Sequence, residues 1–470
     1  EGNGFKLPYI HEIDGCQDPD WVSNTVWYQI FPERFANGNP KLTPDGAREW
    51  DAGIAPNRDD FFGGDLQGII DHLDYLKDLG ITGLYLCPIF EATTNHKYDT
   101  TDYFEIDRHF GDKEVFRNLV EEAHKRGIKV MLDAVFNHIG YQSAQWQDVL
   151  KNGENSPYKD WFHIQEFPIT EDKLKKAREL PYHTFAFASY MPKLNTANPE
   201  VRDYLLSVAT YWIENFDIDA WRLDVANEID HQFWRDFRKA VLAKKPDLYI
   251  LGEIWHTSQP WLQGDEFHAV MNYPLSESIK DYFLRQRKKT EQFISEINSQ
   301  SMYYKQQISE VMFNLLDSHD TERILTTAKG NIQHVKAALT FLYLQKGTPC
   351  IYYGTELALI GGPDPDCRRV MPWDRVSEDN DMLNFMKKLI KVRKEVASII
   401  QHGNYRLEEL KPDVLSLKWN YQGKEVQAIF NQSSEKYTLD RDSVDLASHC
   451  QFEDGQQVIL PDGFVVTISE

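Results

Sequence analysis

Eight short apolar segments alternate along the chain with longer amphipathic segments, and this alternation restricts the fold more than any other feature. The apolar segments cover 25–32, 81–90, 128–138, 218–227, 248–255, 267–273, 311–320 and 348–356. Their apolar residues are continuous, as in parallel strands that are buried on both faces. Apolar residues three or four positions apart predict amphipathic helices over 65–79, 113–126, 199–216 and 231–245. Eight strand–helix units in series predict an α/β fold, a closed (β/α)8 TIM barrel.

Two parts of the chain depart from this pattern. The segment 139–197 contains Gly, Pro and aromatic residues without a clear helical period, and loops of that length are usually functional. We expect an inserted lobe (domain B) there, after the third strand and over the barrel mouth. Short strands between turn residues predict a C-terminal antiparallel β domain, a β-sandwich, over 395–470. The barrel then covers 25–138 and 198–394, preceded by a linker-like segment over 1–24.

Composition excludes several classes of partner. Lys and Arg number 51 and Asp and Glu number 73, a net charge of −22 that would be repelled by nucleic acid and by anionic membranes. No apolar run reaches the roughly 18 residues of a membrane span. Five cysteines without a CxxC pair predict reduced thiols. We expect a cytoplasmic protein with a neutral substrate, no nucleic-acid partner and no membrane partner.

Charged residues gather at the C-terminal ends of the predicted strands, where catalytic groups of such barrels lie. A carboxylate at the end of an apolar strand is costly unless it is paired or functional. A single one could be an ordinary strand-end cap, but the whole set together predicts an active site. The set consists of Asp133, Asn137 and His138 on the third strand, Arg222 and Asp224 on the fourth, Glu253 on the fifth, and His319 and Asp320 on the seventh.

Paired carboxylates of this kind hydrolyse glycosidic bonds. One must be ionised to attack the anomeric carbon, and the other must hold a proton for the leaving oxygen. Arg222, two residues before Asp224, favours the charged form of that carboxylate. The apolar neighbours of Glu253 favour its protonated form. The environments therefore predict Asp224 as nucleophile and Glu253 as acid/base, which leaves Asp320 to stabilise the cationic transition state or to hold ring hydroxyls.

Four motifs resemble, in order and spacing, the signature regions of the α-amylase family of glycoside hydrolases. They are DAVFNH at 133–138, WRLDVANE at 221–228, GEIWH at 252–256 and DSHD at 317–320. MPKLN at 191–195 is similar to an extra region of the neopullulanase, cyclomaltodextrinase and maltogenic amylase subgroup. The resemblance implies a retaining hydrolase of α-1,4-glucosidic bonds in maltodextrins, cyclodextrins or pullulan. It also implies a covalent glycosyl-enzyme intermediate, transglycosylation and some α-1,6 activity.

The resemblance assigns Asp224, Glu253 and Asp320 to the same three catalytic roles. The sugar-binding residues that it implies are His96, Tyr98, His138, Arg222 and His319 around the cleaved bond, Asp364 and Arg368 on the non-reducing side, and Asn227, Glu228 and Trp255 on the leaving-group side. The partners that it implies are α-glucan oligosaccharides. Residues 5–15 resemble the subgroup's linker after an N-terminal β domain, which would make a homodimer.

No cofactor is expected. NGN at 37–39 and GGD at 63–65 resemble a calcium loop, with Asn37, Asn39 and Asp65 as candidate ligands. Calcium takes six to eight oxygen ligands. Leu42 and Thr43 stand where relatives with calcium carry Asn and Asp, so a structural ion is not favoured.

Two other functions compete with hydrolysis by carboxylates. A catalytically silent α-amylase-like barrel, acting as a carbohydrate-binding or transporter-associated module, would have lost its acids or carry a membrane anchor. A metal-dependent barrel hydrolase built on His138 and His319 would carry an HxH or similarly dense ligand pair. All three acids are present and no such pair occurs in the sequence, so the sequence favours the glycoside hydrolase.

Overall fold

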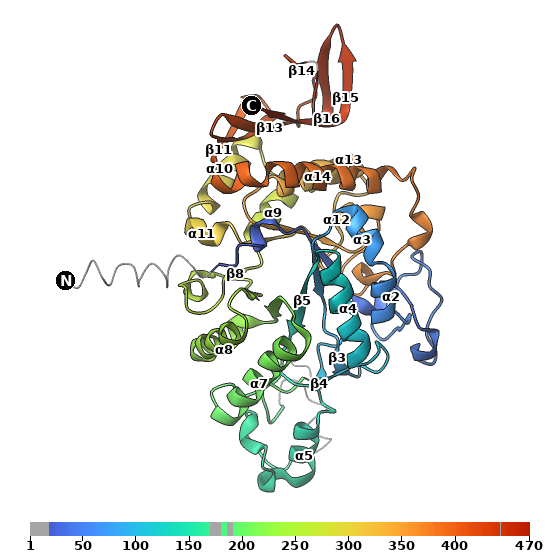
Figure 1. Ribbon diagram of the computed structural model, residues 1–470, viewed down its shortest axis with the longest axis vertical. Helices are drawn as coiled ribbons and strands as arrows, with labels where there is room; N and C mark the ends of the chain where they lie inside the picture. Colours follow the sequence, from blue (N-terminus) through green and yellow to red (C-terminus); the bar gives the residue numbers. More distant parts are fainter. Residues whose placement is uncertain (1–17, 170–179, 186–190, 442) are drawn as a thin grey trace, which may run out of the picture.

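The computed structural model describes residues 18–169, 180–185, 191–441 and 443–470 (Figure 1). Most of the linker-like segment predicted over 1–24 and part of the predicted lobe lie outside these ranges. In Figure 1 the lobe helix α5 (Ala144–Asn152) and the C-terminal strands lie at opposite ends of the molecule, with the barrel between them.

Eight parallel strands form the barrel, and each lies inside one of the eight predicted segments. They are β1 (Trp27–Ile30), β2 (Gly83–Leu86), β5 (Lys129–Ala134), β6 (Ala220–Leu223), β7 (Tyr249–Gly252), β8 (Ala269–Val270), β9 (Phe313–Asn314) and β10 (Thr348–Tyr352). The hydrogen-bonded order is β8-β7-β6-β5-β2-β1-β10-β9. A parallel bridge between Met271 and Phe313 joins the two ends. The predicted TIM barrel is confirmed.

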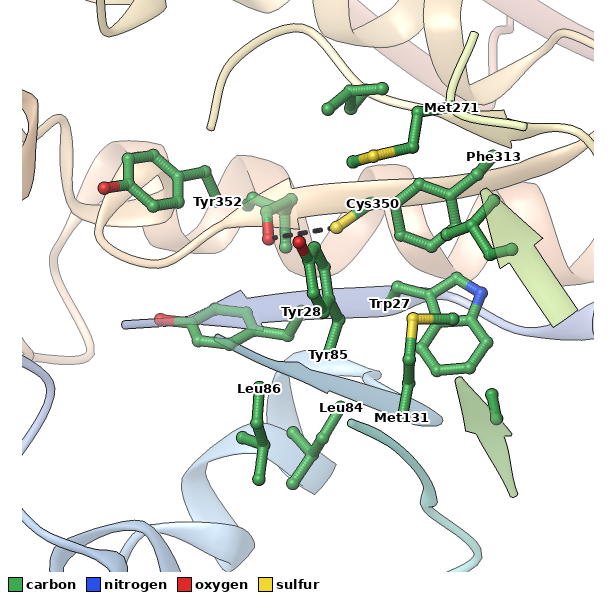
Figure 2. Packing of buried hydrophobic residues seen from close by; sticks show 14 of the residues in the cluster. Trp27, Tyr28, Leu84, Tyr85, Leu86, Met131, Met271, Phe313, Cys350 and Tyr352 are labelled. Carbon is green, nitrogen blue, oxygen red and sulfur yellow. Dashed lines mark hydrogen bonds between the residues drawn. The ribbon is translucent and has the colours of Figure 1, made fainter. Parts of the chain in front are cut away.

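Large side chains fill the barrel, which explains why its strands lack alternation. Figure 2 shows Trp27, Tyr85, Met131, Phe313 and Cys350 converging from five different strands. The Trp27 and Phe313 ring centroids lie 5.9 Å apart, as do those of Tyr85 and Phe313. The barrel is therefore a packed core, and a ligand site must lie at its mouth.

Helices surround the strands. Three long ones match the prediction closely: α4 (Lys113–Lys125), α7 (Pro199–Phe216) and α8 (His231–Lys244). The helix predicted over 65–79 is two helices, α2 (Leu66–Asp71) and α3 (Leu73–Leu79), because His72 leaves helical geometry at φ −114° and ψ 14°. The other α-helices are α9 (Tyr273–Ile279), which continues into the π-helix η9 (Lys280–Leu284), α10 (Thr290–Gln300), α11 (Gln306–Ser309), α12 (Ile324–Thr327), α13 (Ile332–Tyr343) and α14 (Asp381–His402).

Short 3-10 turns lie mainly in the loops at the barrel rim. They are η1 (Val22–Asn24), η2 (Pro32–Arg34), η3 (Pro40–Leu42), η4 (Gly153–Asn155), η5 (Lys159–Trp161), η7 (Ala226–Glu228), η8 (Gln259–Trp261), η10 (Thr355–Leu357), η11 (Asp366–Arg368) and η12 (Trp373–Arg375). Among the described helices, none is both long and apolar enough to cross a bilayer.

The barrel mouth carries a hairpin and the lobe. The hairpin pairs β3 (Phe90–Ala92) with β4 (Thr100–Ile106). The lobe contains α5 (Ala144–Asn152), capped by the Ser143 hydroxyl, so the expectation of no helical period there was wrong. A bridge between His138 and Lys193 connects the described end of the lobe to the residues just after β5. The lobe therefore returns to the C-terminal ends of the strands.

The chain after α14 forms one six-stranded antiparallel sheet, which confirms the predicted C-terminal antiparallel β domain. Its described strands are hydrogen-bonded into a single sheet and not into the two sheets of the predicted β-sandwich. Its strands are β11 (Asn404–Lys411), β12 (Val414–Tyr421), β13 (Lys424–Asn431), β14 (Tyr437–Leu439), β15 (Leu446–Glu453) and β16 (Gln456–Ser469). The boundary predicted at residue 395 falls inside α14, because the apolar face of that helix stays buried as far as Ile400. Phe430 of the sheet packs 5.9 Å from Phe341 of α13, so sheet and barrel share a core.

Candidate active site

A cavity of about 580 Å³ opens at the C-terminal ends of the barrel strands. Twelve of the thirteen predicted catalytic and substrate-binding residues line it, and the thirteenth, Arg222, is fully buried and holds two of its carboxylates. The predicted residues in the lining are His96, Tyr98, His138, Asp224, Asn227, Glu228, Glu253, Trp255, His319, Asp320, Asp364 and Arg368. The barrel thus brings together residues that are up to 272 positions apart in the sequence, from 96 to 368.

Arg222 is the centre of the site's electrostatics. Its Nη1 lies 2.7 Å from Asp224 Oδ1 and 3.0 Å from Asp133 Oδ1, and its Nη2 lies 2.8 Å from Glu253 Oε2. Three consecutive barrel strands supply these groups: β5 carries Asp133, β6 carries Arg222 and leads into Asp224, and Glu253 follows β7. One buried cation therefore faces three carboxylates.

Crowding of the carboxylates changes their acidity. Burial, reinforced by the Glu253 carboxylate, raises the pKa of Asp224 well above its ordinary value, and Arg222 offsets only part of this. Burial raises the pKa of Asp133 to about 6 against the pull of Arg222. Burial and mutual repulsion therefore oppose full ionisation of Asp224 and Asp133, although both contact the same guanidinium.

The predicted difference between the surroundings of Asp224, beside Arg222, and of Glu253, in more apolar company, is not seen in their contacts with Arg222. Arg222 contacts Glu253 as closely as it contacts Asp224. The backbone N–H of Val225 also donates to Glu253 Oε1 at 3.0 Å, so Glu253 is not in purely apolar company. Contact with Arg222 therefore does not distinguish the nucleophile from the acid, and the assignment rests on the matching motifs.

Neutral groups continue the network from Asp133 across the cavity floor. The Tyr98 hydroxyl donates to Asp133 Oδ2 at 2.6 Å and accepts from His319 Nε2 at 2.8 Å. The side-chain amide of Gln29 donates to His319 Nδ1 at 2.8 Å. These partners assign the His319 proton to Nε2. Burial, with Arg368 and Arg222 nearby, lowers the pKa of His319 well below its usual value, so the ring is neutral.

Two further histidines hold the segment that carries Tyr98. His138 Nε2 donates to the Tyr98 carbonyl at 3.0 Å, and His138 Nδ1 accepts from the Asn137 amide at 3.1 Å. Burial lowers the pKa of His138 to about 3. The Tyr98 N–H donates to His96 Nδ1 at 3.0 Å, which leaves the His96 proton on Nε2. His138 therefore lines the cavity while both its nitrogens bond within the protein.

A charged rim closes one side of the cavity. Asp320 is the most accessible of the three predicted acids, with 35% of its side chain exposed, and its Oδ2 lies 3.3 Å from His319 Nε2. Arg368 donates through Nε to the His319 carbonyl at 2.8 Å and lies 3.2 Å from Asp364 Oδ1. Arg368 thus fixes both the His319 backbone and the Asp364 side chain.

The other side carries an exposed aromatic platform. Trp255 is 47% exposed and stacks on Tyr273, with centroids 3.7 Å apart and planes at 7°. Asn227 and Glu228 lie in η7, next to Trp255 in the cavity lining. Lys193 Nζ donates to the Glu228 carbonyl at 3.0 Å and to Asn137 Oδ1 at 2.6 Å. Lys193 therefore ties the lobe to η7 and to the residues just after β5.

The calcium candidates make local hydrogen bonds. Asp65 accepts from the N–H groups of Gly38 and Gly68 through Oδ1 and from that of Asn39 through Oδ2, so it caps α2. The Asn37 amide donates to Thr43 Oγ1, and Asn39 Oδ1 accepts from the Lys41 N–H. Elsewhere in the described ranges, no three His, Cys, Asp or Glu side chains are grouped as metal ligands. The donors at this loop fit a capped turn better than an ion.

Several lining residues were not predicted: Arg58, Phe185, Met191, Val225 and His256. Met191 begins the MPKLN segment, Val225 follows Asp224 and His256 ends GEIWH, so three of the five lie inside quoted motifs. Gln29, beneath the cavity, is a polar residue within an apolar strand, and this was a usable signal. Arg58 and Phe185 lie in loops and give no such signal.

Comparison with known proteins assigns the family. The family described as "Alpha amylase, catalytic domain" matches residues 29–437. The chain belongs to the α-amylase family. Among its relatives, an intracellular maltogenic amylase of Bacillus subtilis is 55% identical over 92% of this chain and 72% of the relative. A cyclomaltodextrinase of Geobacillus thermopakistaniensis is 54% identical over the same shares.

A solved cyclomaltodextrinase structure has a TM-score of 0.88 with 45% identity, covering 97% of this chain and 79% of that one. The family and subgroup resemblance predicted from the motifs is confirmed, and this α-amylase family member is a glycoside hydrolase. The relatives are named as enzymes, which gives no support to the catalytically silent alternative.

Proposed function

We propose that this chain is a retaining hydrolase of α-1,4-glucosidic bonds in maltodextrins, cyclodextrins and pullulan. The observation that carries the proposal is the pairing of Asp224 and Glu253 on the two terminal nitrogens of one buried guanidinium. Retaining glycosidases hold their carboxyl groups about 5–5.5 Å apart, whereas inverting ones leave room for a water. The shared contact with Arg222 favours the shorter spacing.

In the proposed mechanism an Asp224 oxygen attacks the anomeric carbon while Glu253 gives its proton to the leaving oxygen. The glycosidic bond breaks and an ester forms to Asp224. Ionised Glu253 then takes a proton from water, the resulting hydroxide attacks the anomeric carbon, and Asp224 leaves as a carboxylate. A sugar hydroxyl in place of that water gives transglycosylation. Asp320, on the rim, stabilises the cationic transition state.

The cavity walls support the proposed sugar sites. Tyr98, His96 and His319 line the cavity, as do Arg368 and Asp364, to which we assign sugars on the non-reducing side. Trp255, with Asn227 and Glu228, offers a stacking surface for the leaving-group sugars. Phe185 and Met191 of the lobe complete the wall, which supports a role of the lobe in substrate binding. Some α-1,6 cleavage is part of the proposal.

Three further properties belong to the same proposal. The enzyme needs no cofactor, and a structural calcium ion is not favoured. It acts in the cytoplasm, as the name of the intracellular relative supports. If an N-terminal domain precedes the described residues in the full protein, the enzyme is a homodimer.

Proton NMR of the first products of maltotriose hydrolysis tests the proposal. A retaining enzyme releases the α-anomer first, and the β-anomer then grows by mutarotation. The β-anomer appearing first would overturn the mechanism. Absence of any new reducing end from maltotriose, β-cyclodextrin and pullulan would overturn the hydrolase itself and favour a binding module.

A further inference from the structure

The turn that follows Asp224 carries two residues of the leaving-group side. Asn227 and Glu228 of this turn, η7, line the cavity. Val225, just before η7, has a left-handed backbone with φ 46° and ψ 44°. A β-branched residue rarely adopts that conformation, so the contacts around the turn must hold it. We propose that Lys193 of the lobe is a positioning residue for this turn and sets the affinity for sugars on the leaving-group side.

The barrel holds the beginning of the turn. The N–H of Val225 donates to Glu253 Oε1 at 3.0 Å, and the N–H of Ala226 donates to the Glu253 carbonyl at 3.1 Å. The Trp234 indole N–H donates to the Ala226 carbonyl at 3.0 Å. These three hydrogen bonds involve no residue of the lobe. The half of the turn next to Asp224 should therefore keep its geometry when a contact with the lobe is removed.

The lobe holds the end of the turn. Lys193 Nζ donates to the Glu228 carbonyl at 3.0 Å and to Asn137 Oδ1 at 2.6 Å. Asn137 is buried just after β5, so it anchors the ammonium group on the barrel. The Thr196 hydroxyl donates to Asp230 Oδ1 at 2.8 Å, two residues beyond Glu228. Two side chains of the lobe therefore hold the chain where it leaves η7.

Lys193 suits this role because its ammonium group carries donors only, and both of its partners are acceptors. Burial lowers the pKa of Lys193, whereas the nearby Glu228 and Asp230 carboxylates favour its charged form. Lys193 is not among the described residues that line the cavity, so it acts through Asn227 and Glu228 and not by contact with a sugar. The link to leaving-group sugars rests on the proposed function.

The test compares two substrates of the full chain. Cleavage of maltotetraose releases a sugar from the leaving-group side, whereas α-maltosyl fluoride releases only fluoride. Lys193→Met keeps the apolar stem and removes the donors. It should lower kcat/KM for maltotetraose about tenfold, the equivalent of 1.4 kcal/mol for hydrogen bonds from a charged group, and that for the fluoride less than about twofold. Lys151→Met is the matched control, because Lys151 of the lobe helix α5 is exposed and does not line the cavity. It should leave both values unchanged.

Equal losses with the two substrates, or an unchanged kcat/KM for maltotetraose, would overturn the role of Lys193 and leave the proposed function intact. Should Lys193→Met hydrolyse neither substrate, Lys193→Gln decides by the same comparison. Its side chain is uncharged and one atom shorter, so we expect a selective loss of about threefold with maltotetraose, and an unchanged ratio of the two kcat/KM values would overturn the role. Wild-type protein that releases neither reducing ends nor fluoride refutes the proposed function, and the inference with it.

Discussion

The charge of ionised Asp224 is only partly compensated by its surroundings. Because burial and Glu253 both raise the pKa of Asp224, its ionised form destabilises the folded protein at neutral pH. Asp224→Asn should therefore lower kcat by about four orders of magnitude while leaving the free energy of unfolding unchanged or higher. Hydrolysis assays and urea unfolding at pH 7 measure both effects.

The exposed Asp203 provides a matched control, since its side chain is 73% accessible and lies outside the cavity. Asp203→Asn should retain wild-type kcat. Activity of Asp224→Asn above a few per cent of wild type would contradict the nucleophile assignment.

Asp133 should give the enzyme a distinctive dependence of stability on pH. Its pKa rises from 3.8 to about 6 on folding, so the folded protein binds the proton more tightly. The contribution of protonated Asp133 to the free energy of unfolding is therefore fully present below about pH 4 and is lost as the pH rises through about 6. The difference between the two pKa values of Asp133 corresponds to a loss of unfolding free energy on the order of 3 kcal/mol between pH 4 and pH 7.

Asp133→Asn removes this titration, and urea unfolding of both proteins at pH 4 and pH 7 measures it. Relative to the variant, wild type should lose stability at the higher pH. A wild-type-minus-variant difference that is the same at both pH values would refute the assignment, whatever constant effect the substitution itself has.

At the scale of single residues, the sequence indicated the polar residues at the strand ends but not the residues from distant parts of the chain that contact them. Asp224, Glu253 and Asp320 could be predicted because each follows an apolar strand. Gln29 could not be connected to His319, 290 positions away, because only barrel closure places β1 beside that loop. Phe185 was missed because its position depends on how the lobe folds back.

At the scale of elements, apolar continuity predicted all eight barrel strands, and amphipathic spacing predicted α4, α7 and α8. The division between α2 and α3 was not predictable, since His72 bonds the Gly68 carbonyl at 2.8 Å and stacks 3.8 Å from Trp373, a contact distant in sequence. In the C-terminal domain the sequence predicts strands over 414–419, 426–430, 436–439, 457–460 and 464–468. It does not predict β11 or β15, because most of their residues are at least partly exposed and polar, which leaves no hydrophobic pattern.

Helix α7 depends on its cap at the point where the lobe returns to the barrel. Asn198 Oδ1 accepts from the Glu200 N–H at 2.8 Å, and its amide donates to the Asp160 carbonyl at 2.9 Å. Asn198→Ala should lower the free energy of unfolding by about 1–2 kcal/mol, and Asn198→Asp, which keeps the acceptor, should lose less. Chemical denaturation compares the free energies of unfolding of the two variants. Equal losses would show that the hydrogen bond accepted by Asn198 is not its main contribution to stability.

At the scale of the whole molecule, barrel and C-terminal sheet are joined by direct contacts. The Trp419 indole N–H donates to the Leu344 carbonyl at 2.8 Å, and Phe430 and Phe464 belong to the same buried cluster as the barrel strands. A shared core of this size predicts that the two parts unfold together.

Removal of divalent cations should leave this global stability nearly unchanged. Both oxygens of Asp65 already accept backbone N–H groups in the loop that resembles a calcium site. We expect a chelator to shift Tm by less than about 2 °C, which corresponds to less than about 2 kcal/mol for a chain of this size. Differential scanning calorimetry with and without EDTA measures it, and a large fall on EDTA that calcium restores would show that an ion is bound.

The barrel is joined least firmly where it closes. Strands β8 and β9 are two residues long, and one bridge between Met271 and Phe313 connects them. Few hydrogen bonds there mean that local opening should cost less than at β1 or β2, so amide protons at the closure should exchange with deuterium sooner. Tyr273, two residues after Met271, stacks on Trp255 in the lining of the active-site cavity. A glucan held by Trp255 in Glu253→Gln should therefore slow exchange at this closure more than at the opposite strands, which mass spectrometry of deuterated peptides would detect.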